Sequence, residues 1–352
     1  MKILNNNQSS FQRFLFNLFF ISLVFGSFHQ GFSQSKIPEQ PKIEKSILLT
    51  EKTLISESIT YKTDENGNSI LLDIYHPKNT FGRNLPIAIY VHGGAWVLGD
   101  KTIRKGSYIE DLILKLVEKE YIVISINYRL VNEHTHFPSP IQDCKDAVRW
   151  VRKNAEKYHF DTANIGLIGT SAGAHLSLLT AYTSDNDFIG SPELASYSAK
   201  VNYVVDNYGP ADLNKLMRTR LGKVQTAIAG LFLKELLERR SDLLLGLTGY
   251  DIEKDKKKII EICQSVSPLA YVKNAVPTQI LQGNKDKIVP LKQSKKLYKT
   301  LKKNNIETSL TIVDQGTHGF KTTDTDHLHE IVNEMVTFII SHTSLTTSAE
   351  KL

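Results

Sequence analysis

The feature that most constrains the fold of this 352-residue chain is a regular alternation between short apolar runs and segments of helical periodicity. The apolar runs are rich in β-branched residues and lack polar alternation, which is typical of strands buried on both faces. We expect such strands at residues 87–92, 122–128, 165–168, 201–205, 279–282 and 309–313. We expect helices near residues 106–119, 141–157, 172–183, 291–303 and 324–341. This alternation predicts a mainly parallel central sheet covered by helices on both faces, in one α/β domain over residues 48–345.

Two parts of the predicted domain depart from the alternation. Residues 52–77 contain two extended stretches around Asn66-Gly67, a dipeptide that favours a two-residue turn, so an antiparallel hairpin should open the domain. Residues 210–266 show no strand pattern and are rich in Leu, Lys and Arg at helical spacing. We expect a helical insertion there, forming a lid or wall over the carboxyl ends of the strands, where open parallel sheets bind ligands.

The N-terminal region has the layout of a targeting segment. Lys2 and Arg13 precede an apolar run over residues 14–28, which small residues follow as far as Ser33. This layout predicts a secretory signal peptide over residues 1–33, cleaved near Ser33. The apolar run is shorter than the roughly 20 residues that span a bilayer, which argues against a membrane anchor. We therefore expect a periplasmic or secreted protein with no stable membrane insertion, in which the polar residues 34–47 form a linker.

Composition excludes several kinds of partner. The formal net charge is +6, from 43 basic and 37 acidic residues, and acids such as Asp255 lie among the lysines of residues 254–258, so no nucleic-acid partner is indicated. The two cysteines, Cys144 and Cys263, cannot supply a disulfide framework or a four-cysteine zinc site. Two separate buried thiols are the favoured interpretation, and a single bridge stays open. The sequence leaves the oligomeric state undetermined.

The strongest local motif is Gly169-Thr170-Ser171-Ala172-Gly173, which follows one predicted strand and precedes a predicted helix. A serine on such a sharp turn needs glycine on both sides, because side chains there would clash. The turn lifts the Ser171 hydroxyl clear of the sheet, and the helix N-terminus supplies free amides. An ordinary capped turn is the structural alternative. The context favours a nucleophile.

A serine nucleophile requires a base and a group that orients the base. Of the 11 histidines, His318 is the candidate, since it lies in a Gly-flanked loop after the last predicted strand. Asp286 leaves the preceding strand at the same sheet edge, so we assign it the orienting role, with helix capping as the alternative. Asp314 is a rival that lies too near His318 along the chain to reach its ring easily.

The chemistry also needs donors for the negative charge that develops on a substrate oxygen. His92-Gly93-Gly94 ends an early strand, and residues without side chains there let backbone N–H groups point at a substrate. We expect the amides of Gly93, Gly94 and Ala172 to form this oxyanion hole. A tight bend without such a role is the alternative. Four aromatic residues flank the predicted site and could bind substrate or pack the loop bases: Trp96, Tyr128, Tyr208 and Phe320.

These motifs resemble those of the α/β-hydrolases of the esterase and lipase type. His92-Gly93-Gly94 and the serine motif are similar to those of the hormone-sensitive-lipase-like group. A closer resemblance is to the BD-FAE-type carbohydrate esterases, the acetyl and feruloyl esterase relatives of bacteria. The supporting stretches lie at residues 72–77, 127–130, 206–212, 267–268 and 293–298. The resemblance covers about residues 60–340. Residues 131–138 are one residue longer than the usual arrangement, Asn284 stands where an acid is common, and the insertion matches nothing familiar.

The residues and the resemblance together imply an exported serine esterase that needs no metal or organic cofactor. The expected substrates are carboxylic esters, of acetyl or feruloyl type and carried by carbohydrates. A generic short-chain carboxylesterase of lipase-like type is the alternative. A peptidase is less favoured, because no propeller-like repeat precedes the catalytic region. A non-catalytic binding module is the rival from another class.

Overall fold

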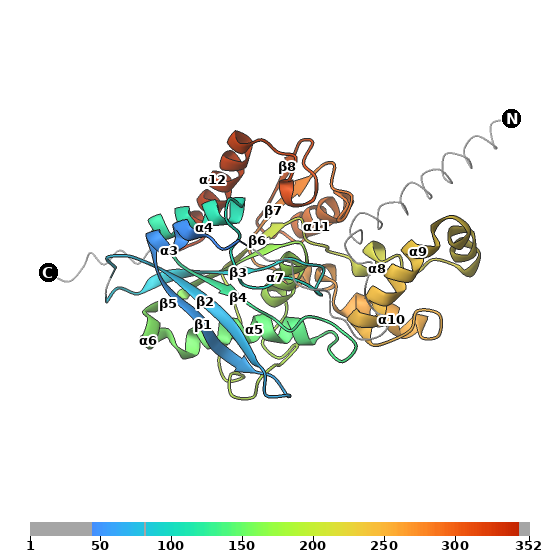
Figure 1. Cartoon of the computed structure of the whole chain (residues 1–352), viewed down its shortest axis with the longest axis horizontal. Helices are drawn as coiled ribbons and strands as arrows, with labels where there is room; N and C mark the ends of the chain where they lie inside the picture. The colour runs from blue at the N-terminus through green and yellow to red at the C-terminus, as the bar shows by residue number, and fades with distance from the viewer. Residues whose placement is uncertain (1–43, 81, 345–352) are drawn as a thin grey trace.

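The computed structural model describes residues 44–80 and 82–344, and at its centre is an eight-stranded sheet in the order β1-β2-β4-β3-β5-β6-β7-β8 (Figure 1). The β1·β2 and β2·β4 pairs are antiparallel, and every other neighbouring pair is parallel. The predicted sheet type is therefore confirmed. The strand bounds are β1 Thr53–Thr63, β2 Ser69–Pro77, β3 Leu85–Val91, β4 Ile122–Ile126, β5 Phe160–Thr170, β6 Tyr203–Asn207, β7 Thr278–Gly283 and β8 Thr308–Val313.

Helices cover both faces of the sheet, and each face has its own apolar core. Alternate side chains of β3 separate the two cores: Ile87 and Ile89 belong to one, Ala88 and Tyr90 to the other. The first core packs under α5 (Ser139–Lys153), α7 (Ala172–Tyr182) and α11 (Lys292–Lys303). The second packs under α3 (Ile47–Lys52), α4 (Tyr108–Glu118) and α12 (Thr325–Ser341). The short helix α6 (Ala155–Tyr158) leads into β5.

The predicted hairpin forms from β1 and β2, but its turn differs from the expected one. The connection runs over residues 64–68, closed by a hydrogen bond from the Asp64 N–H to the Asn68 carbonyl at 2.9 Å. The Asp64 carboxylate accepts from the N–H groups of Asn66 at 2.9 Å and Asn68 at 2.7 Å. Within this turn Gly67 has a positive φ of 82°, whereas Asn66 does not. The side-chain acceptor of Asp64 therefore favours a longer loop than the two-residue Asn-Gly turn.

Residues 210–266 form helices, as the sequence predicts: α8 (Leu213–Leu216), α9 (Lys223–Thr248) and α10 (Lys256–Ser265). Two single-turn helices, η1 (Pro268–Ala270) and η2 (Val272–Asn274), connect them to β7. Figure 1 shows α8, α9 and α10 gathered at one end of the molecule, away from α3 and α6. The C-terminal end of α9 is tied to the extended loop of residues 131–138, because the Phe137 N–H donates to the Leu247 carbonyl at 2.9 Å.

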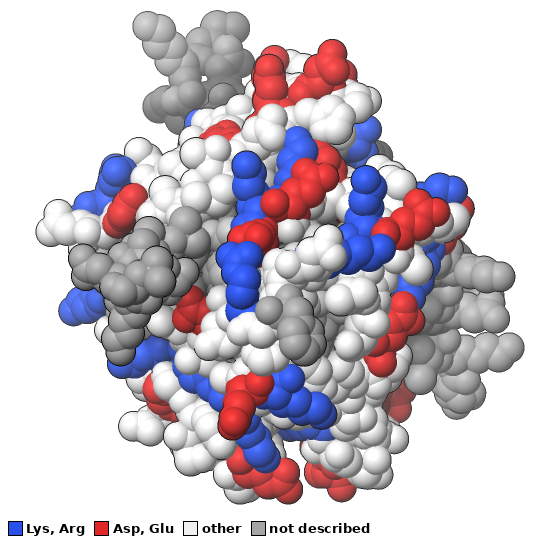
Figure 2. Space-filling model, turned by 90° about the vertical axis from the view of Figure 1, so that its left-hand side faces the viewer, with Lys and Arg blue, Asp and Glu red and all other residues white. Residues whose placement is uncertain are grey.

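The predicted signal peptide, residues 1–33, lies outside the described residues, as does the linker as far as residue 43. At the end of the predicted linker, the Ser46 N–H donates to the Ile103 carbonyl at 3.1 Å, and the Ser46 side chain caps α3. Within the described ranges, we find no helix with the length and apolar character that crossing a bilayer requires. On the face shown in Figure 2, Lys and Arg side chains are interspersed with Asp and Glu, which is typical of a solvated surface.

Both cysteines are buried and unpaired. Cys144 lies on α5 and Cys263 on α10, and both belong to the core beneath α5 and α7. Burial raises the pKa of both thiols, that of Cys263 to about 12. The single bridge that the sequence left open is therefore not formed.

Candidate active site

Ser171 occupies a strained turn between β5 and α7. Its backbone has φ 53° and ψ −116°, a combination that residues with side chains rarely adopt. The flanking glycines leave no room for a Cβ atom. On Gly169 it would lie 2.4 Å from the Cα of Ala174, and on Gly173 it would lie 2.1 Å from the Val91 carbonyl oxygen. The crowding explains why this turn requires glycine on both sides of the serine.

The structure brings the three predicted catalytic residues together from the ends of three strands. The Oγ of Ser171 is 2.9 Å from the Nε2 of His318, and the Nδ1 of His318 is 2.8 Å from the Oδ2 of Asp286. Asp314 is not part of this chain of hydrogen bonds, since its carboxylate accepts from the Asn284 side chain at 2.6 Å. A continuous route for a proton therefore runs from the serine hydroxyl to the imidazole.

The Asp286 side chain is completely buried and is held as an acceptor. Its Oδ1 accepts from the N–H groups of Ile288 at 2.8 Å and Val289 at 2.9 Å. Its Oδ2 accepts from the Gln282 side-chain amide at 2.9 Å as well as from His318. These donors hold the carboxylate beside the Nδ1 of His318, so that Nδ1 carries the proton and donates it to Asp286. The unprotonated Nε2 can then accept a hydrogen bond from the serine hydroxyl.

Two of the predicted substrate-binding aromatics support the histidine instead. The Tyr208 ring lies edge-on to His318 with the ring centres 4.8 Å apart, and it packs on Phe320 at 5.0 Å. Both side chains are buried, with Tyr208 5% and Phe320 1% exposed. The Tyr208 hydroxyl shares a 2.7 Å hydrogen bond with that of Tyr108, and burial raises the pKa of Tyr208. For Tyr208 and Phe320, the burial and these contacts favour packing behind the imidazole, the alternative that the sequence left open, over substrate binding.

Tyr128 packs below the glycine loop, which favours the packing role that the sequence left open for it. Its ring stacks on His92 with the centres 4.3 Å apart, and its hydroxyl donates to the His92 carbonyl at 3.1 Å. Tyr128 is 3% exposed. Burial raises the pKa of Tyr128 and lowers that of His92 to about 4, so both side chains are neutral at pH 7.

The glycine loop lies directly against the serine turn. A Cβ atom on Gly93 would be 2.9 Å from the Thr170 carbonyl oxygen and 3.4 Å from the Cβ of Ser171. Gly94 has a φ of +119°, and a Cβ on it would overlap the Leu98 carbonyl. Ala172 is the first residue of α7, where backbone N–H groups have no acceptor within the helix. Of the three predicted donor residues, Gly93 therefore lies against the serine turn, Gly94 is the next residue of the same loop, and Ala172 directly follows the serine.

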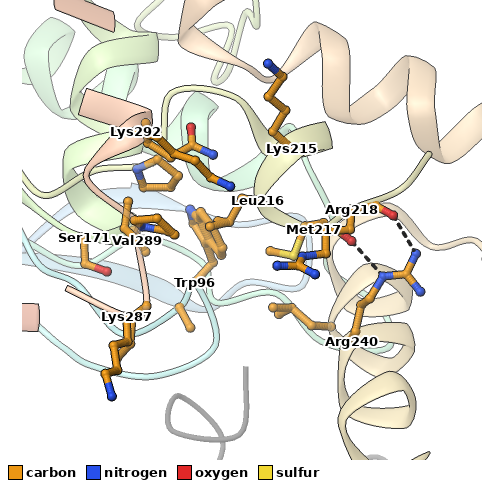
Figure 3. Close-up of a pocket in the computed structure, with 17 residues that line it drawn as sticks. Trp96, Ser171, Lys215, Leu216, Met217, Arg218, Arg240, Lys287, Val289 and Lys292 are labelled. Carbon is orange, nitrogen blue, oxygen red and sulfur yellow. Dashed lines mark hydrogen bonds between the residues drawn. The ribbon is translucent and has the colours of Figure 1, made fainter. Parts of the chain in front are cut away.

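A cavity opens beside Ser171, with about 840 Å³ of empty space that is partly open to solvent (Figure 3). Trp96 lines it, alone among the four predicted aromatic residues. The insertion supplies one side of the wall, and the segment between β7 and α11 supplies another. The wall residues include Ala95, Ala172, Pro210, Leu216, Met217, Leu243, Ile288, Val289 and Pro290.

His175 holds the aromatic part of this wall and was missed by sequence reasoning. The Trp96 indole N–H donates to the Nδ1 of His175 at 3.3 Å, and the Nε2 of His175 donates to the Val266 carbonyl at 2.7 Å. Burial lowers the pKa of His175 to about 4, which matches a neutral ring that both donates and accepts. No sequence pattern separates this histidine from the others. For Gln282, which donates to Asp286, the sequence does give an indication, because it is a polar residue within a predicted apolar strand.

Residues 44–80 and 82–344 contain no group of three or more His, Cys, Asp or Glu side chains arranged to hold a metal ion. The polar groups at the site are instead the serine, histidine and aspartate together with backbone amides. A serine on a strand-to-helix turn, hydrogen-bonded in series to a histidine and an aspartate on later loops of a mainly parallel sheet, is typical of the class of α/β-hydrolases, to which this fold belongs.

Within that class, the chain belongs to the BD-FAE family, whose model matches residues 72–301. It is similar to the esterase LipQ of Mycobacterium tuberculosis, with 31% identity over 232 residues, 65% of this chain and 49% of the relative. It is also similar to the esterase LipC of the same organism, with 27% identity over 234 residues, 66% of this chain and 52% of the relative. The chain thus spans about half the length of these curated relatives.

Solved structures share the fold. A truncated carbohydrate esterase from gut microbiota has a TM-score of 0.61 and 24% identity, over 82% of this chain and 97% of that one. An acetyl ester-xyloside bifunctional hydrolase from Caldicellulosiruptor lactoaceticus has a TM-score of 0.60 and 21% identity, over 81% of this chain and 96% of that one. At these identities the likeness establishes the architecture.

Proposed function

We propose that this protein is a serine carboxylic ester hydrolase that acts through an acyl-enzyme intermediate. The observation that carries the proposal is the hydrogen-bonded series from the Ser171 hydroxyl through His318 to the buried Asp286 carboxylate. It stands beside an open cavity, so an ester carbonyl can reach the hydroxyl. Membership of the BD-FAE family and the similarity to two mycobacterial esterases support the same chemistry.

In the proposed reaction, His318 takes the Ser171 proton as the serine oxygen attacks the ester carbonyl. Asp286 stabilises the imidazolium that forms. When the tetrahedral intermediate collapses, the C–O bond to the alcohol breaks and His318 returns the proton to the leaving oxygen. A water molecule then attacks the acyl-enzyme by the same route, which releases the acid and restores the serine.

The negative charge of each tetrahedral intermediate needs donors placed before the reaction starts. The amides of Gly93, Gly94 and Ala172 are the proposed donors, because they come from the glycine loop that lies against the serine turn and from the helix N-terminus that follows Ser171. Fixed amides of this kind need no rearrangement as the charge develops, so they favour the transition state over the substrate.

We propose that the substrates are acylated carbohydrates carrying acetyl or feruloyl-type groups. Support comes from the family match and from the names of two structural neighbours, a carbohydrate esterase and an acetyl ester-xyloside hydrolase. Generic short-chain esters are the second candidate, because the apolar wall around Trp96 also suits a small acyl chain. Acetylated xylan, feruloylated sugars and p-nitrophenyl esters of increasing length distinguish the two candidates.

Ser171→Ala is the direct test of the proposed chemistry. The purified variant should hydrolyse p-nitrophenyl acetate about 10⁴-fold to 10⁶-fold more slowly than the parent, since the nucleophile is removed. A fluorophosphonate probe should label the parent and leave the variant unlabelled. Equal rates for parent and variant would show that Ser171 is not the nucleophile. A parent that neither turns over esters nor reacts with the probe would indicate a binding module.

We propose in addition that the protein is exported, on the basis of the charged start and apolar run of residues 1–33. Mass spectrometry of the protein recovered outside the cytoplasm should find a new N-terminus near residue 34. Recovery of the full chain from the cytoplasm alone would contradict the proposal.

A further inference from the structure

The cavity beside Ser171 has an unusual charge composition. Of the 17 described residues that line it, five are Lys or Arg and none is Asp or Glu: Lys215, Arg218, Arg240, Lys287 and Lys292 are the cations. The remainder of the wall is mostly apolar. Lys215, Lys287 and Lys292 are exposed, but Arg218 is half-buried and Arg240 is buried, so the charges of these two arginines lose hydration. A cavity that bound only neutral esters would gain nothing from that cost.

Three of the cations come from three different elements of the wall. Arg218 follows α8, Arg240 lies on α9, and Lys292 begins α11. In Figure 3 the Lys292 side chain extends across the cavity toward Leu216. The tips of the lysines at 215 and 287, in contrast, point away from the middle of the view. Lys292 thus extends into the cavity, whereas Lys215 and Lys287 lie at its rim.

Arg240 is a built feature and not a flexible surface side chain. It is 3% exposed. Its Nε donates to the Met217 carbonyl at 2.7 Å, and one Nη donates to the Arg218 carbonyl at 3.3 Å (Figure 3). Both of these acceptors are neutral, so these two bonds orient the guanidinium, and the nearby Glu253 carboxylate offsets part of its charge. Arg240 therefore fixes the backbone that carries the next cation, Arg218.

The electrostatics show that these positive charges affect one another. Burial lowers the pKa of Lys292, and the charges of Arg218 and Lys215 lower it further. Burial also lowers the pKa of Arg240, and Arg218 adds to that effect, while the nearby carboxylate of Glu253 opposes it. A bound anion would relieve this repulsion, because it favours the charged form of every cation near it.

A second hollow continues the same surface. It lies beside α8 and shares Lys215 and Arg218 with the cavity wall. Asp212 is the one carboxylate among its described lining residues, and it pairs with Lys296 at 3.0 Å. The hollow thus extends the positive surface away from Ser171. A substrate with more than one sugar unit could extend along this hollow.

We propose that this site selects esters that carry a carboxylate close to the scissile bond. The inference rests on the proposed esterase function and narrows its substrate class. Guanidinium groups match a planar carboxylate with two parallel hydrogen bonds, and a lysine adds a point charge. Two sources would supply this carboxylate, a uronic acid residue on the sugar side of the ester or a dicarboxylic acid on the acyl side.

The test compares matched pairs of esters that differ in one charge. For the sugar side, acetate release is followed from monoacetylated methyl glucuronoside and monoacetylated methyl glucoside. For the acyl side, the p-nitrophenyl monoester of adipic acid is compared with p-nitrophenyl hexanoate. In at least one pair the kcat/KM for the charged ester should exceed that for the neutral ester about tenfold at low salt. Raising NaCl to about 0.5 M should reduce this ratio, because salt screens the attraction.

Lys292→Gln and Arg218→Gln should each lower the charged-to-neutral ratio about fivefold to tenfold, since each removes one cation from the wall. Lys295→Gln is the matched control. It removes a charge from the same helix as Lys292, and both lysines are exposed, but Lys295 lines neither hollow. This control should keep the parental ratio. Circular dichroism and the melting temperature establish that each variant is folded.

The outcomes separate the charge selection from the esterase function. A preference in the sugar pair assigns the carboxylate to the saccharide, and a preference in the acyl pair assigns it to the acid. Hydrolysis that depends on Ser171 and shows no preference in either pair would overturn the charge selection and leave the esterase function intact. Equal ratios for Lys292→Gln and Lys295→Gln would overturn the charge selection as well. A failure to hydrolyse any of the four esters, with no probe labelling, would overturn the esterase function itself.

Discussion

At the scale of single residues, the site depends on buried polar side chains that orient the catalytic groups without touching substrate. Gln282 is the clearest case. Its amide donates to Asp286 at 2.9 Å, and its Oε1 accepts from the Ser294 hydroxyl at 2.7 Å. The glutamine therefore links α11 to the carboxylate that orients His318. A polar network of this kind is most effective when every member has a partner.

Replacing Gln282 by Leu should lower kcat on p-nitrophenyl acetate roughly tenfold with little change in KM, because the carboxylate loses one donor and gains freedom to rotate. Gln279→Leu is the control. Gln279 is a buried amide on the same strand, but it donates to Glu334 on α12, far from the serine. Both variants should be less stable than the parent. If both lose the same fraction of kcat, the effect of Gln282 is one of general destabilisation.

A second prediction concerns Asp206 on β6, which is fully buried. Its Oδ1 accepts from the Gly209 N–H at 2.7 Å, while its Oδ2 has no partner among the described atoms. Burial raises the pKa of Asp206 to about 7. Because the folded state keeps a proton that the unfolded chain loses near pH 4, the free energy of unfolding should fall as the pH rises from about 4 through 7.

Asp206→Asn removes this titration and keeps the shape of the side chain. Urea unfolding of parent and variant at about pH 5 and pH 8 should therefore show a shift of about 2 kcal/mol in favour of the variant at the higher pH. A difference between the two proteins that stays constant with pH would mean that Asp206 does not titrate in this range.

At the scale of elements, the sequence predicted the order and type of the strands but not all of their ends. The strand expected at residues 201–205 is β6, which the structure places at Tyr203–Asn207 and which therefore includes Asp206 and Asn207. Hydrophobic patterning could not find these two, because they are polar residues buried beside the serine turn. The Asn207 carbonyl accepts from the Ser171 N–H at 2.9 Å, and its side chain donates to the Gly169 carbonyl at 3.1 Å. Asn207 therefore holds that turn in place.

The candidate site could likewise be predicted in part from the sequence. Ser171, Asp286 and His318 could be predicted because their roles impose glycines and strand ends that are visible in the sequence. The directions of the aromatic side chains could not. Trp96 reaches the cavity wall from a backbone with a positive φ of 65°, whereas Tyr128 packs beneath the same loop. Only tertiary packing decides between two such positions.

The junction between α9 and the loop of residues 131–138 gives a prediction at this scale. Gly249 ends α9 with a φ of 76°, and a Cβ atom on it would lie 2.9 Å from the His136 ring. That ring is itself held by the Gly246 carbonyl at 2.8 Å. Gly249→Ala should therefore cost more than the roughly 1 kcal/mol expected for a positive φ alone, as measured by chemical unfolding.

Gly106→Ala is the matched control, because Gly106 has a φ of 69° and open space around it. The difference between the two variants isolates the crowding at His136, and adding His136→Ala to Gly249→Ala should recover part of it. Equal costs at the two glycines would mean that the loop moves aside freely.

At the scale of the whole molecule, buried ion pairs connect the edge of the sheet to a helix on its face. Lys62 on β1 lies 2.8 Å from Asp143 and 2.7 Å from Asp146, both on α5. Asp143 also pairs with Arg129 at 2.8 Å, and Asp146 with Arg149 at 3.0 Å. Both carboxylates are completely buried. The antiparallel hairpin is thus fastened to the parallel part of the fold by charges as well as by strand pairing.

Removing Asp143 should destabilise the entire domain. Asp143→Ala removes one buried acceptor from both Lys62 and Arg129, so the free energy of unfolding should fall by about 3 kcal/mol. Glu44→Ala breaks a comparable contact, the 2.7 Å pair with Lys105, but Glu44 is 72% exposed and the loss should stay below about 1 kcal/mol. Similar losses for the two variants in urea unfolding would contradict a structural role for the buried network.

Ser171, Asp286 and His318 follow strands β5, β7 and β8, and the first and last of them are 147 positions apart in the sequence. They are therefore synthesised at widely separated times. A nascent chain that already displays the nucleophile has no base to activate it. The proposed hydrolysis therefore cannot begin before the loop that follows β8 has been made and has folded beside Ser171.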